Sequence, residues 1–115
     1  MTWGEMASAT LAEVQAAGKL DPVKDYLRVD GEDDDQMVFS CVKAAYRYIL
    51  DGVGEFDEGS QTAEMLLLAI TQDLYDNRTL TESEQQWKMR QSYTYQSIIL
   101  QLQMAKSLRE EGDDA

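Results

Sequence analysis

The chain has 115 residues, of which 43% are hydrophobic, and its 22 acidic and 10 basic residues give it a formal net charge of −12. This length fits one domain with a modest core. A single cysteine excludes an internal disulfide, and the lack of histidine removes the commonest metal ligand and general base, so we expect no enzyme, no metal site and no cofactor. The acidic excess opposes adhesion to nucleic acid, because phosphate contacts need clustered Lys and Arg.

The fold class predicted from the composition is all-α. One proline and seven glycines impose few breaks on the chain, which favours long helices over many short strands. We expect a small helical bundle of three main helices plus a short N-terminal helix, with extended arms or a loop. No stretch has the 18 or so apolar residues that span a bilayer, and the first 20 residues lack a basic signal segment, so we expect a soluble, intracellular protein without a membrane partner.

Residues 1–20 predict an N-terminal arm that is weakly helical or ordered by a partner, ahead of a helical domain over residues 21–109. Within this arm, Thr10 and Glu13 have the spacing of a capping box. Asp21 and Pro22 then offer an N-cap followed by a proline in the first turn, which predicts a short helix over residues 22–28.

The segment 34–52 has the clearest helical pattern of the chain. Four apolar residues fall within about 60° of one another on a helical wheel and form a core-facing stripe: Val38, Val42, Ala45 and Ile49. Gly52 and Gly54 supply the stop signal. Cys41 lies beside the stripe and is expected to be a buried small hydrophobe, because no histidine is available to activate it.

Two further segments, 62–77 and 95–109, predict helices that are apolar on two sides. Each has a stripe suited to a core, formed by Ala63, Leu67, Ile70 and Leu74 in the first and by Tyr95, Ile98, Leu102 and Ala105 in the second. Each also has a second stripe, formed by Met65, Leu68 and Tyr75 in the first and by Leu100, Met104 and Leu108 in the second. Such a helix is covered either within its own domain or by a neighbouring subunit, and the pattern leaves both open.

The remaining segments are polar. Residues 78–92 have few apolar side chains, among them Trp87, and run longer than the usual helix connection; Thr81 or Ser83 is suited to cap a short helix inside them. Residues 110–115 predict an acidic, disordered tail.

An acidic cluster precedes the helix of residues 34–52 and consists of Asp30, Glu32, Asp33, Asp34 and Asp35. A calcium loop that begins at Asp30 needs glycine at its sixth position and glutamate at its twelfth, but these positions hold Asp35 and Val42. The spacing therefore excludes a calcium loop of the EF-hand type. The cluster is instead typical of a helix start, where one aspartate caps the helix and the others face the positive end of its dipole.

Two stretches of the chain, "YLRVDGEDDDQMVFSCVKAAYRYI" and "AEMLLLAITQDLYDNR", resemble the small head-tail connector proteins of tailed bacteriophages, also known as adaptor or DNA-packaging proteins. In that family a Leu-Arg/Lys-Val/Ile-Asp segment precedes an acidic run and a helix with alanines and Tyr-Ile, and a second helix ends near Tyr-x-Asn-Arg. These features fall here on Leu27, Arg28, Val29 and Asp30; on Asp33 to Asp35; on Ala44, Ala45, Tyr48 and Ile49; and on Leu67, Leu68, Tyr75, Asn77 and Arg78.

The resemblance implies a structural protein of the virion without catalytic activity. It implies a homo-oligomeric ring of about twelve copies at the head-tail interface, which joins the portal protein to a downstream neck or tail-completion protein and lets the packaged DNA pass without specific binding. Assembly in the host cytoplasm is expected. The residues predicted to meet a neighbouring subunit or partner are Met65, Leu68, Tyr75, Arg78, Trp87, Leu100 and Met104.

The alternative is an acidic DNA mimic that inhibits a DNA-binding protein, or another small helical interaction protein. A mimic spreads its carboxylates over one face at phosphate-like intervals. Here they concentrate in residues 30–35, 55–58 and 110–114, which favours the connector.

Overall fold

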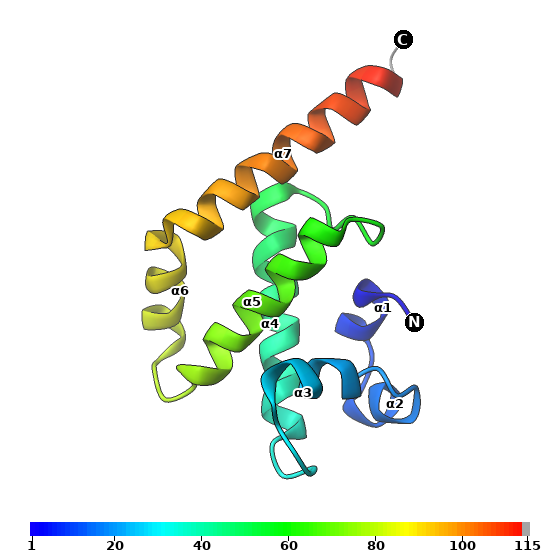
Figure 1. The fold of residues 1–115 in the computed structure, drawn as a ribbon, viewed down its shortest axis with the longest axis vertical. Coiled ribbons are helices and arrows are strands. Elements are labelled where there is room, and N and C mark those ends of the chain that lie inside the picture. The colour runs from blue at the N-terminus through cyan, green and yellow to red at the C-terminus, as the bar shows by residue number, and fades with distance from the viewer. Residues whose placement is uncertain (114–115) are drawn as a thin grey trace.

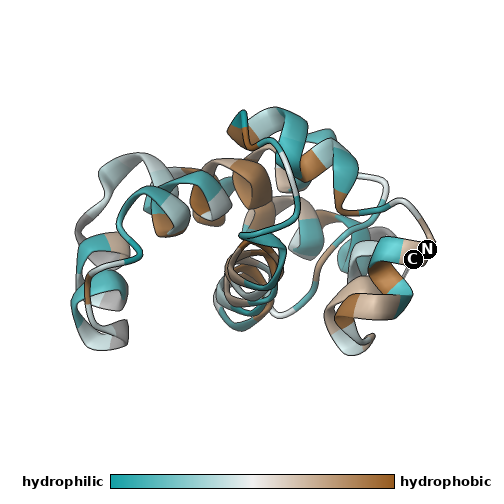
Figure 2. Cartoon of the chain, turned by 90° about the horizontal axis from the view of Figure 1, so that it is seen from below, coloured by the Kyte–Doolittle hydropathy of each residue, from teal (hydrophilic) through white to brown (hydrophobic). Residues whose placement is uncertain are grey.

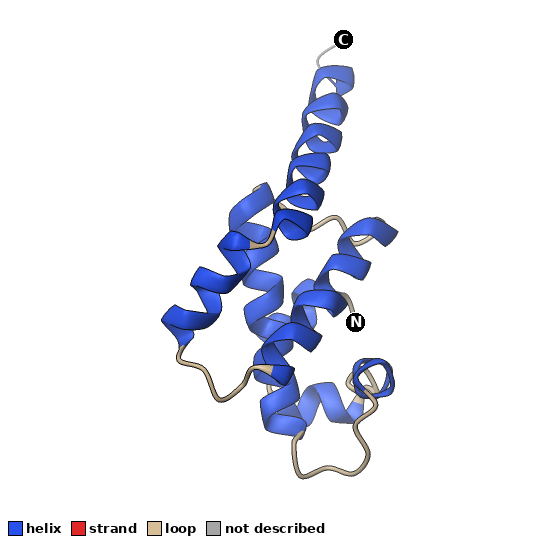
Figure 3. Ribbon diagram, turned by 60° about the vertical axis from the view of Figure 1, so that its left-hand side comes forward, coloured by secondary structure: helices blue, strands red, loops and turns tan. Residues whose placement is uncertain are grey.

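The computed structural model describes residues 1–113 of the chain and confirms the predicted all-α class. Within these residues the regular structure consists of helices joined by short loops, and no strand is present (Figures 1 and 3). The helices are α1 (Trp3–Ser8), α2 (Leu11–Ala16), α3 (Asp21–Leu27), α4 (Asp35–Val53), α5 (Gln61–Asp76), α6 (Glu82–Gln91) and α7 (Tyr93–Asp113).

Helices α4 and α5 pack together at the centre of the molecule. Their ends agree with the predicted segments 34–52 and 62–77 to within one residue, the ordinary uncertainty of helix boundaries. The predicted core stripes are confirmed, since every residue of both is buried. The α5 stripe and the second half of the α4 stripe, with parts of α6 and α7, form the large core, which contains Cys41, Ala45, Ile49, Val53, Ala63, Leu66, Leu67, Ile70, Leu74, Met89, Ile99 and Leu102.

Helices α1, α2 and α3 pack around the first half of α4. The first two of these helices lie within residues 1–20, the predicted N-terminal arm. Their apolar side chains form the small core, which contains Met6, Val14, Leu20, Val23, Val38, Phe39 and Val42. The capping box predicted for α2 is confirmed: the Glu13 backbone N–H donates to Thr10 Oγ1 at 3.2 Å, and the Thr10 N–H donates to Glu13 Oε1 at 3.3 Å. Residues 1–20 are thus folded against the rest of the chain.

A carboxylate from the α4–α5 loop holds the start of α1. The Trp3 and Gly4 backbone N–H groups donate to the two carboxylate oxygens of Glu58, at 2.8 and 3.2 Å. The first N–H groups of a helix have no partner inside the helix, so this contact satisfies two of them and ties α1 to a loop 55 residues away.

Helices α6 and α7 form the C-terminal part of the fold. α6 begins after Thr81, whose hydroxyl accepts from the Glu84 N–H at 3.2 Å, and most of it is hydrophilic (Figure 2). α7 crosses α4 near Gly52, where an added Cβ would lie 3.3 Å from Ile99, so the glycine permits the close approach. α7 continues to Asp113, beyond the predicted end at residue 109, and residues 114–115 of the predicted tail lie outside the described residues.

Candidate interaction surface

The buried member of the acidic cluster is Asp35, which has an internal role. Lys24 Nζ lies 2.7 Å from Asp35 Oδ1, and the Gln15 side-chain amide donates to Asp35 Oδ2 at 2.9 Å. The hydrogen bond to Lys24, followed by that to Gln15, lowers the pKa of Asp35, and the same contact raises the pKa of Lys24. Asp35 therefore ties α2 and α3 to the start of α4.

The rest of the cluster divides between the fold and the solvent. Asp34 occupies the N-cap position of α4, but the predicted side-chain cap is wrong there: no side-chain cap bond forms at this helix. The Asp34 carboxylate instead accepts a hydrogen bond from the Tyr75 hydroxyl, which raises the pKa of Tyr75. Asp30, Glu32 and Asp33 are exposed and are the members that can face a partner.

The predicted interface on α5 is partly covered by the chain itself. Met65 is 70% exposed, but Leu68 and Tyr75 are half-buried against the small core. The Arg78 guanidinium lies over the Tyr75 ring, 4.5 Å from its centroid, and donates to the Tyr75 backbone carbonyl at 2.8 Å. The N-terminal helices thus provide the second cover that the two-sided pattern of residues 62–77 requires.

The second apolar side of α7 is not covered. Tyr93 is 86% exposed, Leu100 55%, Met104 57% and Leu108 67%, and we call these four residues the α7 stripe. Their spacings of seven, four and four residues place them along one side of a helix. Trp87 on α6 is also exposed. Tyr93 was absent from the predicted interface, although its distance of seven residues from Leu100 is a signal that identifies it.

The opposite side of α7 is held to the body by polar contacts. The Tyr95 hydroxyl donates to Asp73 Oδ2 at 2.7 Å, and the Gln103 side-chain amide donates to the Gly52 carbonyl at 2.6 Å. Burial first, and the hydrogen bond to Asp73 second, raise the pKa of Tyr95 well above its ordinary value. These contacts fix the rotation of α7 about its axis, so the stripe faces away from the molecule.

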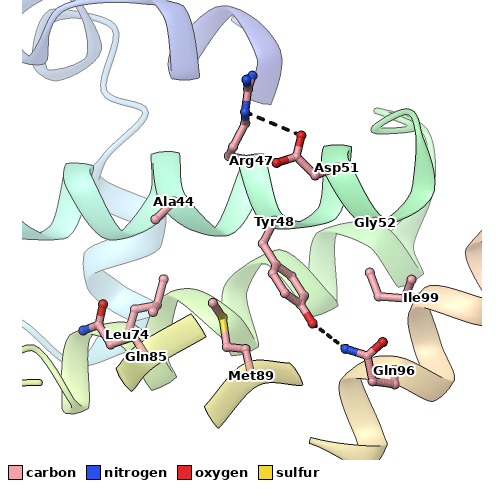
Figure 4. A pocket seen from close by; sticks show the side chains of 10 residues that line it. All are labelled: Ala44, Arg47, Tyr48, Asp51, Gly52, Leu74, Gln85, Met89, Gln96 and Ile99. Atoms are coloured by element: carbon pink, nitrogen blue, oxygen red, sulfur yellow. Dashed lines mark hydrogen bonds and ion pairs between the residues drawn. The ribbon is translucent and has the colours of Figure 1, made fainter. Parts of the chain in front are cut away.

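A groove of about 470 Å³ lies between α4, α6 and α7. Figure 4 shows Leu74, Met89 and Ile99 among its lining side chains, with polar groups of α4 and α7 around them. Arg47 Nε lies 3.6 Å from Asp51 Oδ1, so the two charged side chains of the groove offset each other. The volume is within the range of about 300–1,000 Å³ that is typical of ligand sites.

Other chemistry finds no support in the described part of the chain. Its Cys, Asp and Glu side chains include no group of three that is placed to hold a metal ion. Cys41 is buried, and burial raises the pKa of its thiol to about 11, so it is protonated at neutral pH. None of the described helices is both long and apolar enough to cross a membrane.

Comparison with known proteins gives one result for this chain. Residues 18–103 match the family described as phage gp6-like head-tail connector proteins. No curated protein and no solved structure matches the chain. The matched range begins before α3 and ends within α7, so it includes the groove, Leu100 and the acidic cluster.

Proposed function

The chain belongs to the phage gp6-like head-tail connector family, and we propose that it joins the head of a tailed phage to its tail as a homo-oligomeric ring. The ring contains about a dozen copies and sits between the portal protein and a downstream neck or tail-completion protein. The observation that carries the proposal is the family match over residues 18–103, because the family's role is structural. Copies assemble in the host cytoplasm and remain in the virion.

The exposed apolar side chains support assembly into a larger structure. Four of them lie along α7, and Trp87 and Met65 are 62% and 70% exposed on α6 and α5. Contiguous apolar surface on a soluble protein marks an interaction site. An assembly that covers α7 in every copy requires a contact repeated around a symmetry axis, as in a ring.

The charge of the chain suits a channel through which DNA passes. A formal net charge of −12 repels the phosphate backbone, and the ten basic residues are scattered along the sequence among 22 acidic ones. The exposed cluster members Asp30, Glu32 and Asp33 extend this potential to the loop before α4. The connector therefore surrounds DNA without binding it specifically.

Electron microscopy of the purified chain mixed with the portal protein of the same phage tests the proposal. The expected result is a closed ring of the chain stacked on the portal, which images of the portal alone lack. If the two proteins do not associate under conditions in which the portal itself is intact, the proposed function is wrong.

A further inference from the structure

We propose that neighbouring copies of the chain contact each other head to tail, with the α7 stripe of one copy seated in the groove between α4, α6 and α7 of the next. This inference rests on the proposed function, since it names the contact by which the ring assembles. It identifies the partner of both surfaces as a second copy of the same chain.

The position of α7 makes its stripe available to another copy. The C-terminal half of α7 projects beyond the packed helices (Figures 1 and 3), so a neighbour can approach it without meeting the body of the molecule. The molecule measures 50 × 32 × 20 Å, and α7, at 21 residues, is about 31 Å long. The stripe, from Tyr93 to Leu108, runs along about 22 Å of this helix.

The groove is suited to receive apolar side chains. Leu74, Met89 and Ile99 are among its lining residues, and its volume of about 470 Å³ is large enough for protruding side chains such as Met104 and Leu108. Apolar anchors that enter a pocket carry most of the binding energy of an interface. Polar groups of α4 and α7 surround the apolar part, as the rim of an interface requires.

The lack of net charge on both surfaces favours a second copy as the occupant. Two chains that each carry −12 repel each other wherever their acidic segments meet. Residues 93–105 contain no charged side chain, although 28% of the residues of the chain are charged. In the groove, Arg47 and Asp51 form an ion pair, so neither surface adds net charge to the contact. A basic partner would need an acidic surface, and neither the α7 stripe nor the groove is acidic.

The two surfaces are different, and this determines the kind of assembly. A contact between a patch on one copy and a different patch on the next is heterologous, and it generates a ring if the rotation closes. A contact of one stripe with another would be isologous and would stop at a dimer. Gln96 and Ile99, which line the groove, project roughly 100° around the helix from the middle of the stripe, so the two surfaces lie on different sides of α7 and each copy can use both at once.

Sedimentation velocity of four proteins tests this contact: the wild-type chain, Met104→Asp in the stripe, Ala44→Trp in the groove, and Ala12→Asp as a control. Ala44 and Ala12 are exposed, and Ala12 lies on α2, away from α7, so the control adds the same charge outside the contact. Circular dichroism checks that each variant retains its helices. We expect wild type and Ala12→Asp to form large species, and self-association to weaken about a hundredfold or more in the other two. In Met104→Asp the contact would bury a carboxylate without a partner, and in Ala44→Trp the indole would fill the groove.

Mixing the two defective variants gives the decisive result. Met104→Asp has an intact groove and Ala44→Trp has an intact stripe, so the mixture is expected to form dimers that contain one copy of each and grow no larger. Any of three results overturns the inference: the mixture stays monomeric, the wild type does not self-associate, or Met104→Asp assembles as the wild type does. Binding to the portal is measured separately: a chain that assembles as described but leaves the portal unbound contradicts the proposed function alone.

Discussion

Replacing Met6 with alanine tests whether the N-terminal helices are a folded part of the domain. Met6 is 2% exposed in the small core, and the substitution removes three heavy atoms from it. At about 0.8 kcal/mol per buried methylene, the lost transfer free energy is roughly 2.4 kcal/mol. The cavity left behind raises the expected loss in free energy of unfolding to about 3 kcal/mol, which corresponds to a fall in Tm of about 10 °C.

Urea unfolding followed by far-UV circular dichroism measures this loss, and Met65→Ala is the matched control. Met65 is 70% exposed, so the same chemical change is expected to cost about 0.7 kcal/mol or less. If Met6→Ala costs no more than Met65→Ala, residues 1–20 do not pack against α4 in solution. The arm would then be ordered only by a partner.

Three further predictions concern Tyr95, Asp35 and Cys41. Tyr95→Phe removes the hydrogen bond to Asp73 and is expected to lower the free energy of unfolding in urea by about 1.5 kcal/mol. The control Tyr93→Phe, at a residue that is 86% exposed, is expected to leave this free energy unchanged. Equal effects of the two substitutions would contradict the packing of α7. Folding lowers the pKa of Asp35, so the stability that this residue contributes is present above the ordinary carboxyl pKa of 3.8 and is lost as the pH falls through the lower folded value. Asp35→Asn is therefore expected to reduce the slope of the free energy of unfolding against pH in that range. An unchanged slope would show that the ion pair is absent. The Cys41 thiol, buried and with a pKa raised to about 11, is expected to react with a thiol reagent at pH 8 far more slowly than in urea, and comparable rates would place it on the surface.

The family was predicted from two stretches of sequence and is confirmed by the match over residues 18–103. The order of the acidic cluster, the alanine-containing helix and the final Tyr-x-Asn-Arg was sufficient for this, although each feature by itself is weak. The assignment of individual residues to an interface stays a prediction. Leu68 and Tyr75 look like Leu100 and Met104 on a helical wheel, but only the second pair lies on a side of its helix that the rest of the chain leaves open.

The sequence by itself determined the local features of this protein. The positions of α4 and α5, their core stripes and the capping box at Thr10 and Glu13 all depend on residues within a few turns of one another, and helical periodicity records them directly. The negative charge of the chain is likewise a property of composition. None of these depends on how distant segments meet.

Tertiary structure decided which surfaces remain open. Leu68 and Tyr75 on the second face of α5 are packed against helices some forty residues earlier in the chain, whereas the second face of α7 has no such cover in the described structure. The role of Asp35 was decided in the same way, since its partners Lys24 and Gln15 lie on α3 and α2. Periodicity shows that a helix has two apolar sides, but which of them is buried depends on contacts between residues far apart in sequence, and those exist only in the folded chain.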